Sequence, residues 1–222
     1  MSKSPNHFID LCIRHHILTF GEFTLKSGRV SPYFFNAGLF SDGLLLYELA
    51  SEYAKLVRQI MAESPGQYML YGPAYKGIPL AAACAVALAL KYKKENHIHY
   101  AFNRKESKDH GEGGDIVGAN LRGKVIIIDD VITAGTSVEE SVRIIRAAGA
   151  EPVAVVIALD REEVADDTGL SAVQAVEATH GIPVHPIIRL TDLVEHLAGR
   201  EELTAHASAV AAYRAHYGIS SG

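Results

Sequence analysis

The sequence lacks the features that mark secreted, membrane-spanning or nucleic-acid-binding proteins. It has only two cysteines, Cys12 and Cys84, which are far apart and in no metal-binding spacing. We expect both to be reduced and buried in a cytoplasmic protein. The longest apolar run, Ile78 to Leu90, is too short to span a bilayer, and we expect no secretory segment at the N-terminus. A formal net charge of −5 argues against nucleic acid as the main partner.

Common metal and phosphate motifs are missing as well. Among eleven histidines, only His97 and His99 have a spacing that suggests a metal site, and no third ligand lies near them in the sequence. The chain has neither the Gly-Lys-Ser/Thr ending of a Walker A loop nor the Gly-x-Gly-x-x-Gly of a dinucleotide-binding turn. Any phosphate site must therefore be of another kind.

The length and pattern of the chain predict a single α/β domain. Its 222 residues, 48% of them hydrophobic, suffice for a sizeable core. Repeated strand–helix units predict a central parallel sheet with helices on both faces and a ligand at the carboxyl ends of the strands. The predicted strands are 68–71, 98–102, 125–129, 152–159 and 184–188. The predicted helices are 4–16, 41–61, 77–94, 137–148 and 171–179, followed by two terminal helices, one capped by Thr191. Residues 20–36 predict a small antiparallel hairpin with its turn at 27–29.

The most informative segment runs from Val125 through Asp129 and Asp130 into the small-residue turn 131–137. An apolar strand, two carboxylates, a hydroxyl-rich turn and an amphipathic helix follow one another. The helix N-terminus would offer free N–H groups to a phosphate. Carboxylates beside that site suit a sugar phosphate, whose hydroxyls they can accept from, or a phosphate bound with Mg²⁺. The alternative is an ordinary strand–helix turn with a solvated acidic edge.

Two other segments could neutralise a polyanion. Lys76 lies in the glycine-containing turn 72–77, just before a predicted helix, although a solvated lysine is the simpler interpretation. The loop at about 103–115 carries several basic residues followed by three glycines. It suits a lid that closes over a polyanion and excludes water, although its mixed charge also fits a solvated loop.

The acidic turn resembles the phosphoribosyl-diphosphate (PRPP) loop of type I phosphoribosyltransferases. In addition, residues 23–34 read Phe-x-Leu-Lys-Ser-Gly-Arg-x-Ser-Pro-Tyr-Phe and resemble the hood of the orotate phosphoribosyltransferases. The resemblance extends over nearly the whole chain. It implies one domain over residues 1–222, with a hood mainly at 1–40 and a lid at about 103–115. The implied reaction converts orotate and PRPP to orotidine 5′-monophosphate and diphosphate in de novo pyrimidine (UMP) biosynthesis.

The resemblance also implies roles for individual residues. The implied catalytic residues are Lys108, Asp129 and Asp130. The implied PRPP-binding residues are Lys26, Tyr75, Lys76, Arg104, Lys105, Lys108, His110, Asp129, Asp130, Val131, Ile132, Thr133, Ala134, Gly135, Thr136 and Ser137. The implied orotate-binding residues are Phe34, Phe35, Thr133 and Arg161. Mg²⁺ is the implied cofactor, held mainly through PRPP and water, with no protein ligand.

The orotate-binding residues have other interpretations. Phe34 and Phe35 could belong to the core, although an aromatic face suits a flat base. The planar guanidinium of Arg161 matches a carboxylate, which orotate carries and purines lack. Arg161 could instead form a surface ion pair with Glu162 or Glu163.

The family resemblance further implies a homodimer in which lid residues serve the neighbouring subunit, with no nucleic-acid or membrane partner. Val30, Ser107 and Ser137 depart from the pattern of close relatives, the first two by lacking a lysine. Two alternative functions stay open. One is a related enzyme acting on a purine or another base, and the other is a PRPP-sensing transcription regulator without catalysis.

Overall fold

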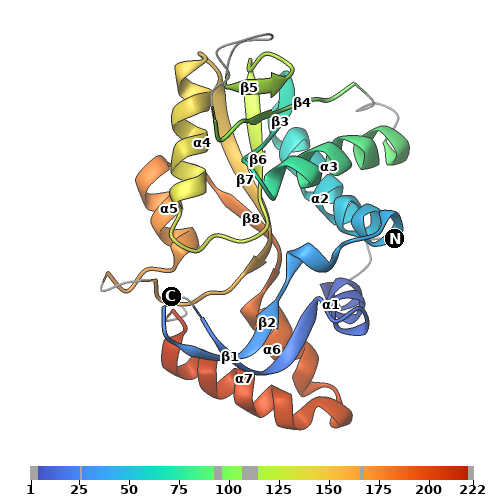
Figure 1. Cartoon of the computed structure of the whole chain (residues 1–222), viewed down its shortest axis with the longest axis vertical. Helices are drawn as coiled ribbons and strands as arrows, with labels where there is room; N and C mark the ends of the chain where they lie inside the picture. Colours follow the sequence, from blue (N-terminus) through green and yellow to red (C-terminus); the bar gives the residue numbers. More distant parts are fainter. Residues whose placement is uncertain (1–4, 26, 93–96, 107–114, 166–167, 220–222) are drawn as a thin grey trace.

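A computed structural model describes residues 5–25, 27–92, 97–106, 115–165 and 168–219 of the chain. The described part forms a six-stranded sheet flanked by helices and a separate two-stranded hairpin (Figure 1). The strands of the large sheet are β3 (Tyr68–Gly72), β4 (His99–Asn103), β5 (Ile116–Gly118), β6 (Lys124–Ile128), β7 (Glu151–Asp160) and β8 (Val184–Arg189).

The order of strands in this sheet is β5-β4-β3-β6-β7-β8, and all neighbours are parallel except β4 and β5. From β3 the chain proceeds to β4 on one side, whereas from β6 it proceeds to β7 and β8 on the other. The strand order therefore reverses between β3 and β6. In open α/β sheets, ligands bind beyond the carboxyl ends of the strands at such a reversal.

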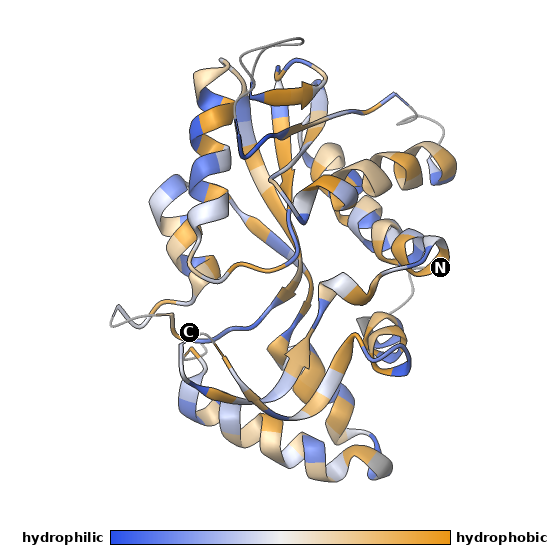
Figure 2. Cartoon of the chain, viewed as in Figure 1, coloured by the Kyte–Doolittle hydropathy of each residue, from blue (hydrophilic) through white to orange (hydrophobic). Residues whose placement is uncertain are grey.

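Helices cover both faces of the sheet. One face packs against α2 (Gly43–Glu63) and α3 (Gly77–Lys91), and the other against α4 (Thr136–Ala147) and α5 (Ala172–His180). Alternate residues of β6 serve the two cores, because Ile126 and Ile128 belong to one hydrophobic cluster and Val125 and Ile127 to the other. This explains the unbroken apolar run in the sequence, and the central strands are accordingly orange in Figure 2.

The N-terminal hairpin packs against C-terminal helices. Its strands, β1 (Leu18–Thr24) and β2 (Val30–Phe35), pair antiparallel. The hairpin lies along α7 (Thr204–Tyr217), while α1 (Pro5–Arg14) packs against α6 (Leu190–Ala198) (Figure 1). The beginning and the end of the described chain thus form one layer at the base of the molecule.

The predicted fold class is confirmed, with two corrections in detail. The short strand β5 was not predicted, and its antiparallel pairing makes the sheet mostly, not wholly, parallel. Helix α6 begins at Leu190 with Arg189 as its N-cap, so Thr191 lies within the first turn and does not cap the helix. At α2 the N-cap is Asp42, whose side chain accepts from the N–H groups of Leu44 and Leu45. No helix in the described ranges is both long and apolar enough to cross a membrane.

Two glycines allow the turn after β3 to lie against the end of β6. A Cβ on Gly77 would be 2.7 Å from the carbonyl oxygen of Ile128, and one on Gly72 would be 2.1 Å from the carbonyl oxygen of Gly77. Both distances are shorter than any real contact of a Cβ atom. A side chain at Gly77 would push the turn away from the end of β6, and one at Gly72 would push away the start of α3.

We therefore predict that Gly77→Ala lowers the free energy of unfolding by at least about 2 kcal/mol, because the backbone of β6 must shift to admit the methyl group. Urea unfolding followed by circular dichroism measures this change. Gly43→Ala is the matched control, because nothing lies within 4 Å of a Cβ at Gly43. Equal stability of the two variants would contradict the proposed close approach.

Candidate active site

The acidic pair lies directly after β6, at the reversal of strand order. Asp129 and Asp130 are only 7% and 6% exposed. One carboxylate oxygen of Asp129 accepts from the N–H of Asp130 at 2.9 Å, and the other accepts from the Ser137 hydroxyl at 3.0 Å. Beneath the pair, the Tyr53 hydroxyl donates to the backbone carbonyl of Asp129 at 2.7 Å. Contacts from α2 and from the start of α4 therefore fix the orientation of Asp129.

The surroundings of Asp129 disfavour the ionised form of its carboxyl group. Burial, with the nearby charge of Asp130, raises its pKa to about 6. The hydrogen bonds from Asp130 N–H and Ser137, and the charge of Lys76, oppose this rise without cancelling it. Asp129 is thus mostly ionised at neutral pH, and additional hydroxyl donors would stabilise the charge. The hydroxyl groups of a ribose are donors of this kind.

Lys76 connects the turn after β3 to the acidic pair. Its Nζ lies 2.5 Å from Oδ2 of Asp130, and its side chain is 64% exposed, so it also remains open to a ligand. In the same turn, the N–H of Ala74 donates to Oδ1 of Asn103 at 2.9 Å. Asn103 ends β4 and is buried. Three adjacent strand ends are therefore joined by polar contacts.

Asn103 and Tyr53 support the site and were not predicted from the sequence. A polar residue at the end of an apolar strand is the signal that could have identified Asn103, because Asp129 occupies the same place after β6. The sequence carries no comparable signal for Tyr53. It lies in the middle of an amphipathic helix, where a tyrosine indicates an ordinary core residue.

The turn 131–137 is open to solvent at the N-terminus of α4. Thr133, Ala134 and Thr136 are exposed. Gly135 is the N-cap, with φ of 74° in the left-handed region that favours glycine, and it has no side chain to bond the first N–H groups of the helix. The first N–H groups of a helix and nearby hydroxyls are groups to which an anion can bind.

The ends of the predicted lid are fastened together. Residue Asn103 pairs with Ile116 between β4 and β5, and the N–H of Arg104 donates to the carbonyl of Asp115 at 2.8 Å. Arg104 and Lys105 lie at this base. Lys26, Lys108 and His110 are outside the described residues.

The aromatic residues predicted at the site differ in their surroundings. Phe34 is 39% exposed and stacks on Phe23, with 5.5 Å between ring centroids. Phe35 points to the other side of β2 and packs against the core, next to Phe40. Tyr75 is 70% exposed beside Lys76. Phe34 and Tyr75 are thus partly open to solvent, whereas the ring of Phe35 is largely used in packing.

Arg161 follows β7 at the same edge of the sheet. Its Nε and Nη2 lie 2.8 Å and 2.7 Å from Oε1 of Glu163, and its guanidinium stacks 5.1 Å above the ring centre of Tyr33. The ion pair named as an alternative therefore exists. It is not a surface pair, however, because the Arg161 and Glu163 side chains are only 20% and 11% exposed.

Comparison with known proteins gives concordant results. Residues 46–180, more than half of the chain, match the phosphoribosyl transferase domain family. The chain is 56% identical over 220 residues to the orotate phosphoribosyltransferase of Marinobacter nauticus, covering 99% of this chain and 100% of that one. For the enzyme of the same name from Thioalkalivibrio sulfidiphilus, the identity is 54% with the same coverage. The crystal structure of the orotate phosphoribosyltransferase from Francisella tularensis is similar with a TM-score of 0.82 at 41% identity, covering 96% of this chain and 99% of that one.

The environment of Asp129 leads to a prediction about pH. Because its folded-state pKa of about 6 exceeds the ordinary value of 3.8, this carboxyl destabilises the fold increasingly as pH rises between these values and constantly above them. Asp129→Asn should therefore be more stable than the wild type by about 2 kcal/mol at pH 7.5, with a smaller gain near pH 4.5.

Urea unfolding at several pH values measures this gain. Asp42→Asn is the control, since asparagine can cap α2 as well as aspartate does. A gain for Asp129→Asn that does not change with pH would show that the buried charge is not its cause.

Proposed function

The chain belongs to the orotate phosphoribosyltransferase family, and we propose that it transfers the 5-phosphoribosyl group from PRPP to orotate, giving orotidine 5′-monophosphate and diphosphate. This reaction belongs to de novo pyrimidine (UMP) biosynthesis. The observation that carries the proposal is the Asp129–Asp130 pair at the strand reversal, ion-paired with Lys76 and followed by an open helix N-terminus. Identity above 50% over the full length of named relatives supports the same activity.

We propose that PRPP lies along the carboxyl ends of β3 and β6. Asp129 and Asp130 would accept hydrogen bonds from the ribose hydroxyls, and residues 131–137 would surround the 5′-phosphate. The diphosphate would meet positive charge and polar groups from the turn after β3, the hairpin and the lid. These groups belong to Lys26, Tyr75, Lys76, Arg104, Lys105, Lys108 and His110.

Orotate would bind between the hairpin and the end of β7. The Arg161 guanidinium suits its carboxylate, Thr133 offers a hydroxyl, and the exposed ring of Phe34 can lie against the flat base. For Phe35, the packed ring leaves the backbone as the group that could contact orotate. Purine bases lack a carboxylate, so this arrangement favours orotate over them.

The proposed reaction needs positioning more than acid–base chemistry. A ring nitrogen of the orotate anion attacks C1 of the ribose, and the bond from C1 to the diphosphate oxygen breaks as positive charge develops on the sugar. The buried carboxylates stabilise that charge through the ribose, while the basic residues stabilise the departing diphosphate. A closed lid would exclude water, which could otherwise take the place of orotate.

Mg²⁺ is part of the proposal as a cofactor that arrives with PRPP. Across the described residues, no three His, Cys, Asp or Glu side chains are placed to hold a metal ion together. The hydroxyl and phosphate oxygens of PRPP, together with water, suit an ion that keeps much of its hydration shell. When bound, the ion would neutralise charge on the leaving diphosphate.

We further propose a cytoplasmic homodimer whose lid residues act in the neighbouring site, within a chain divided into a hood at about 1–40, a lid at about 103–115 and a core between and beyond them. The separate β1–β2 sheet and the fastened lid ends support this division. The two cysteines are free and buried, in keeping with a reducing compartment.

The proposed activity predicts rapid loss of orotate absorbance when the protein is mixed with orotate, PRPP and Mg²⁺. Excess EDTA should suppress the loss, and added Mg²⁺ should restore it. Hypoxanthine and adenine, tested with the same PRPP, should give no product. Tight PRPP binding without orotate turnover would reject the proposed base and favour a sensor or another transferase.

The shared lid predicts complementation between two impaired variants. Lys108→Ala and Asp130→Asn should each reduce turnover about a hundredfold. Because a mixed dimer would combine an intact acidic pair with an intact lid from its partner, equal co-expression should restore about a quarter of wild-type turnover. Each variant expressed alone is the control. Failure of the purified mixed dimer to recover activity would show that Lys108 serves its own subunit.

A further inference from the structure

We propose that Glu163 is a positioning residue for orotate recognition: it holds one edge of the Arg161 guanidinium so that the opposite edge is directed to the carboxylate of the bound base. The inference rests on the function proposed above. It extends the site to a residue that does not touch substrate and to the C-terminal helix α7.

The contacts of Arg161 divide its guanidinium into two edges. Nε and Nη2 form the side edge, and both lie within 2.8 Å of Oε1 of Glu163. The other edge is formed by Nη1 and the second N–H of Nη2, and Nη2 has a long contact of 3.5 Å to the Ser31 hydroxyl. The Tyr213 hydroxyl also lies within hydrogen-bonding reach of the guanidinium. Two parallel N–H donors on this end edge match the two oxygens of a carboxylate.

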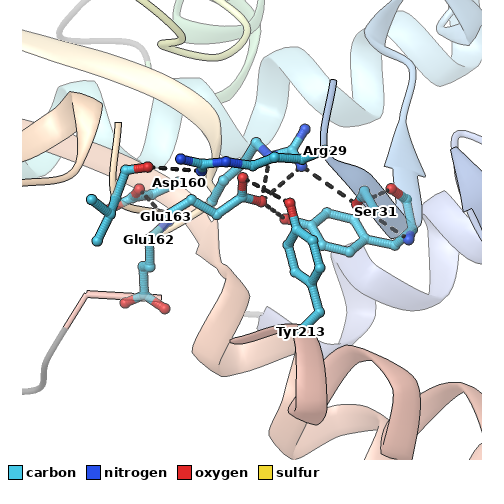
Figure 3. Close-up of polar contacts among 9 residues, drawn as sticks. Arg29, Ser31, Asp160, Glu162, Glu163 and Tyr213 are labelled. Carbon is cyan, nitrogen blue, oxygen red and sulfur yellow. Dashed lines mark hydrogen bonds and ion pairs between the residues drawn. The ribbon is translucent and has the colours of Figure 1, made fainter. Parts of the chain in front are cut away.

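Glu163 is itself held in place by two tyrosines. Tyr33 of β2 donates its hydroxyl to Oε1 at 3.1 Å, and Tyr213 of α7 donates to Oε2 at 3.1 Å (Figure 3). The ring of Tyr33 also lies beneath the guanidinium of Arg161. Burial, together with the charge of Glu163, raises the pKa of both tyrosines, which therefore remain hydrogen-bond donors. The Arg161 side chain is thus held from below and from one side.

The backbone around Glu163 is equally constrained. Glu162 has φ of 49°, in the left-handed region that non-glycine residues seldom adopt. Its N–H donates to Oδ1 of Asp160 at 2.9 Å, and its carboxylate accepts from the N–H and the hydroxyl of Thr191. Two residues later, the carbonyl of Val164 accepts from Nη1 of Arg29 at 2.8 Å. So many contacts on a five-residue loop are consistent with a side chain that must be placed accurately.

This arrangement has a specific energetic consequence. Without Glu163, the long Arg161 side chain would be free to sample several rotamers, and its ordering would be a cost of binding orotate. The proposed contacts between the protein and PRPP would not change, because the acidic pair follows β6 and Lys76 lies in the turn after β3. The loss should therefore appear in the use of orotate.

The test compares initial rates for the wild type and for Glu163→Gln, varying each substrate while the other is saturating. We expect KM for orotate to rise about tenfold or more, with kcat and KM for PRPP changed less than about threefold. Tyr213→Phe, which removes one donor to Glu163 and a hydroxyl beside the Arg161 guanidinium, should raise KM for orotate by a smaller factor. Glu177→Gln is the control for loss of a carboxylate near this loop, because the Glu177 carboxylate accepts from the N–H of Val184 and not from Arg161.

A double-mutant cycle with Arg161→Ala then separates positioning from general stability. If Glu163 acts through Arg161, Glu163→Gln should change KM for orotate by less than about twofold in the Arg161→Ala background. The same factor in both backgrounds, or an equal rise in KM for PRPP, would overturn the inference. Should Glu163→Gln not fold, Tyr213→Phe in the two backgrounds gives the same comparison. A wild type without orotate turnover would reject the proposed function, whereas an active wild type with an unchanged Glu163→Gln would reject only this inference.

Discussion

The ion pair between Lys76 and Asp130 is the contact on which the arrangement of the site depends. It joins the turn after β3 to the end of β6, the two strands at which the sheet order reverses. The two segments can come this close only because Gly77 leaves room for the carbonyl of Ile128. Charge alone would not hold them, since Lys76 is well exposed and surface pairs contribute little. Backbone packing brings the two segments together, and the ion pair then holds the Lys76 ammonium next to the Asp130 carboxylate.

The sequence predicted the parts of the molecule that follow from local pattern. Apolar strands, amphipathic helices and the acidic turn each carry a periodic or compositional signal, and the structure has them nearly where expected. It did not predict β5, because three residues after a long polar loop are too short to show a period. Nor did it predict the hydrogen bond from Tyr53 to Asp129 or the one from Tyr33 to Glu163 beside Arg161. These contacts join residues 76 and 130 positions apart, and no local pattern encodes them.

Arg161 shows how a prediction and its alternative can both describe one residue. One interpretation was an ion pair with Glu162 or Glu163, and the other was binding of the carboxylate of a substrate. The guanidinium has two edges, so one carboxylate on its side edge leaves the other edge available. Asp129 is comparable, because Ser137 and the N–H of Asp130 use its carboxylate only in part. At both places contacts within the protein use part of the hydrogen-bonding capacity of the side chain.

The loop after β7 also constrains the order in which the molecule can be completed during synthesis. Its contacts come from Arg29 near the beginning of the chain and from Tyr217 and Ile219, which donate or accept at Val164 and Glu162. A nascent chain that has left the ribosome up to the end of β7 has its acidic pair and its hairpin, yet lacks the C-terminal residues Tyr217 and Ile219 that bond this loop. The turn 131–137 is therefore synthesised before the C-terminal residues that hold the loop after β7.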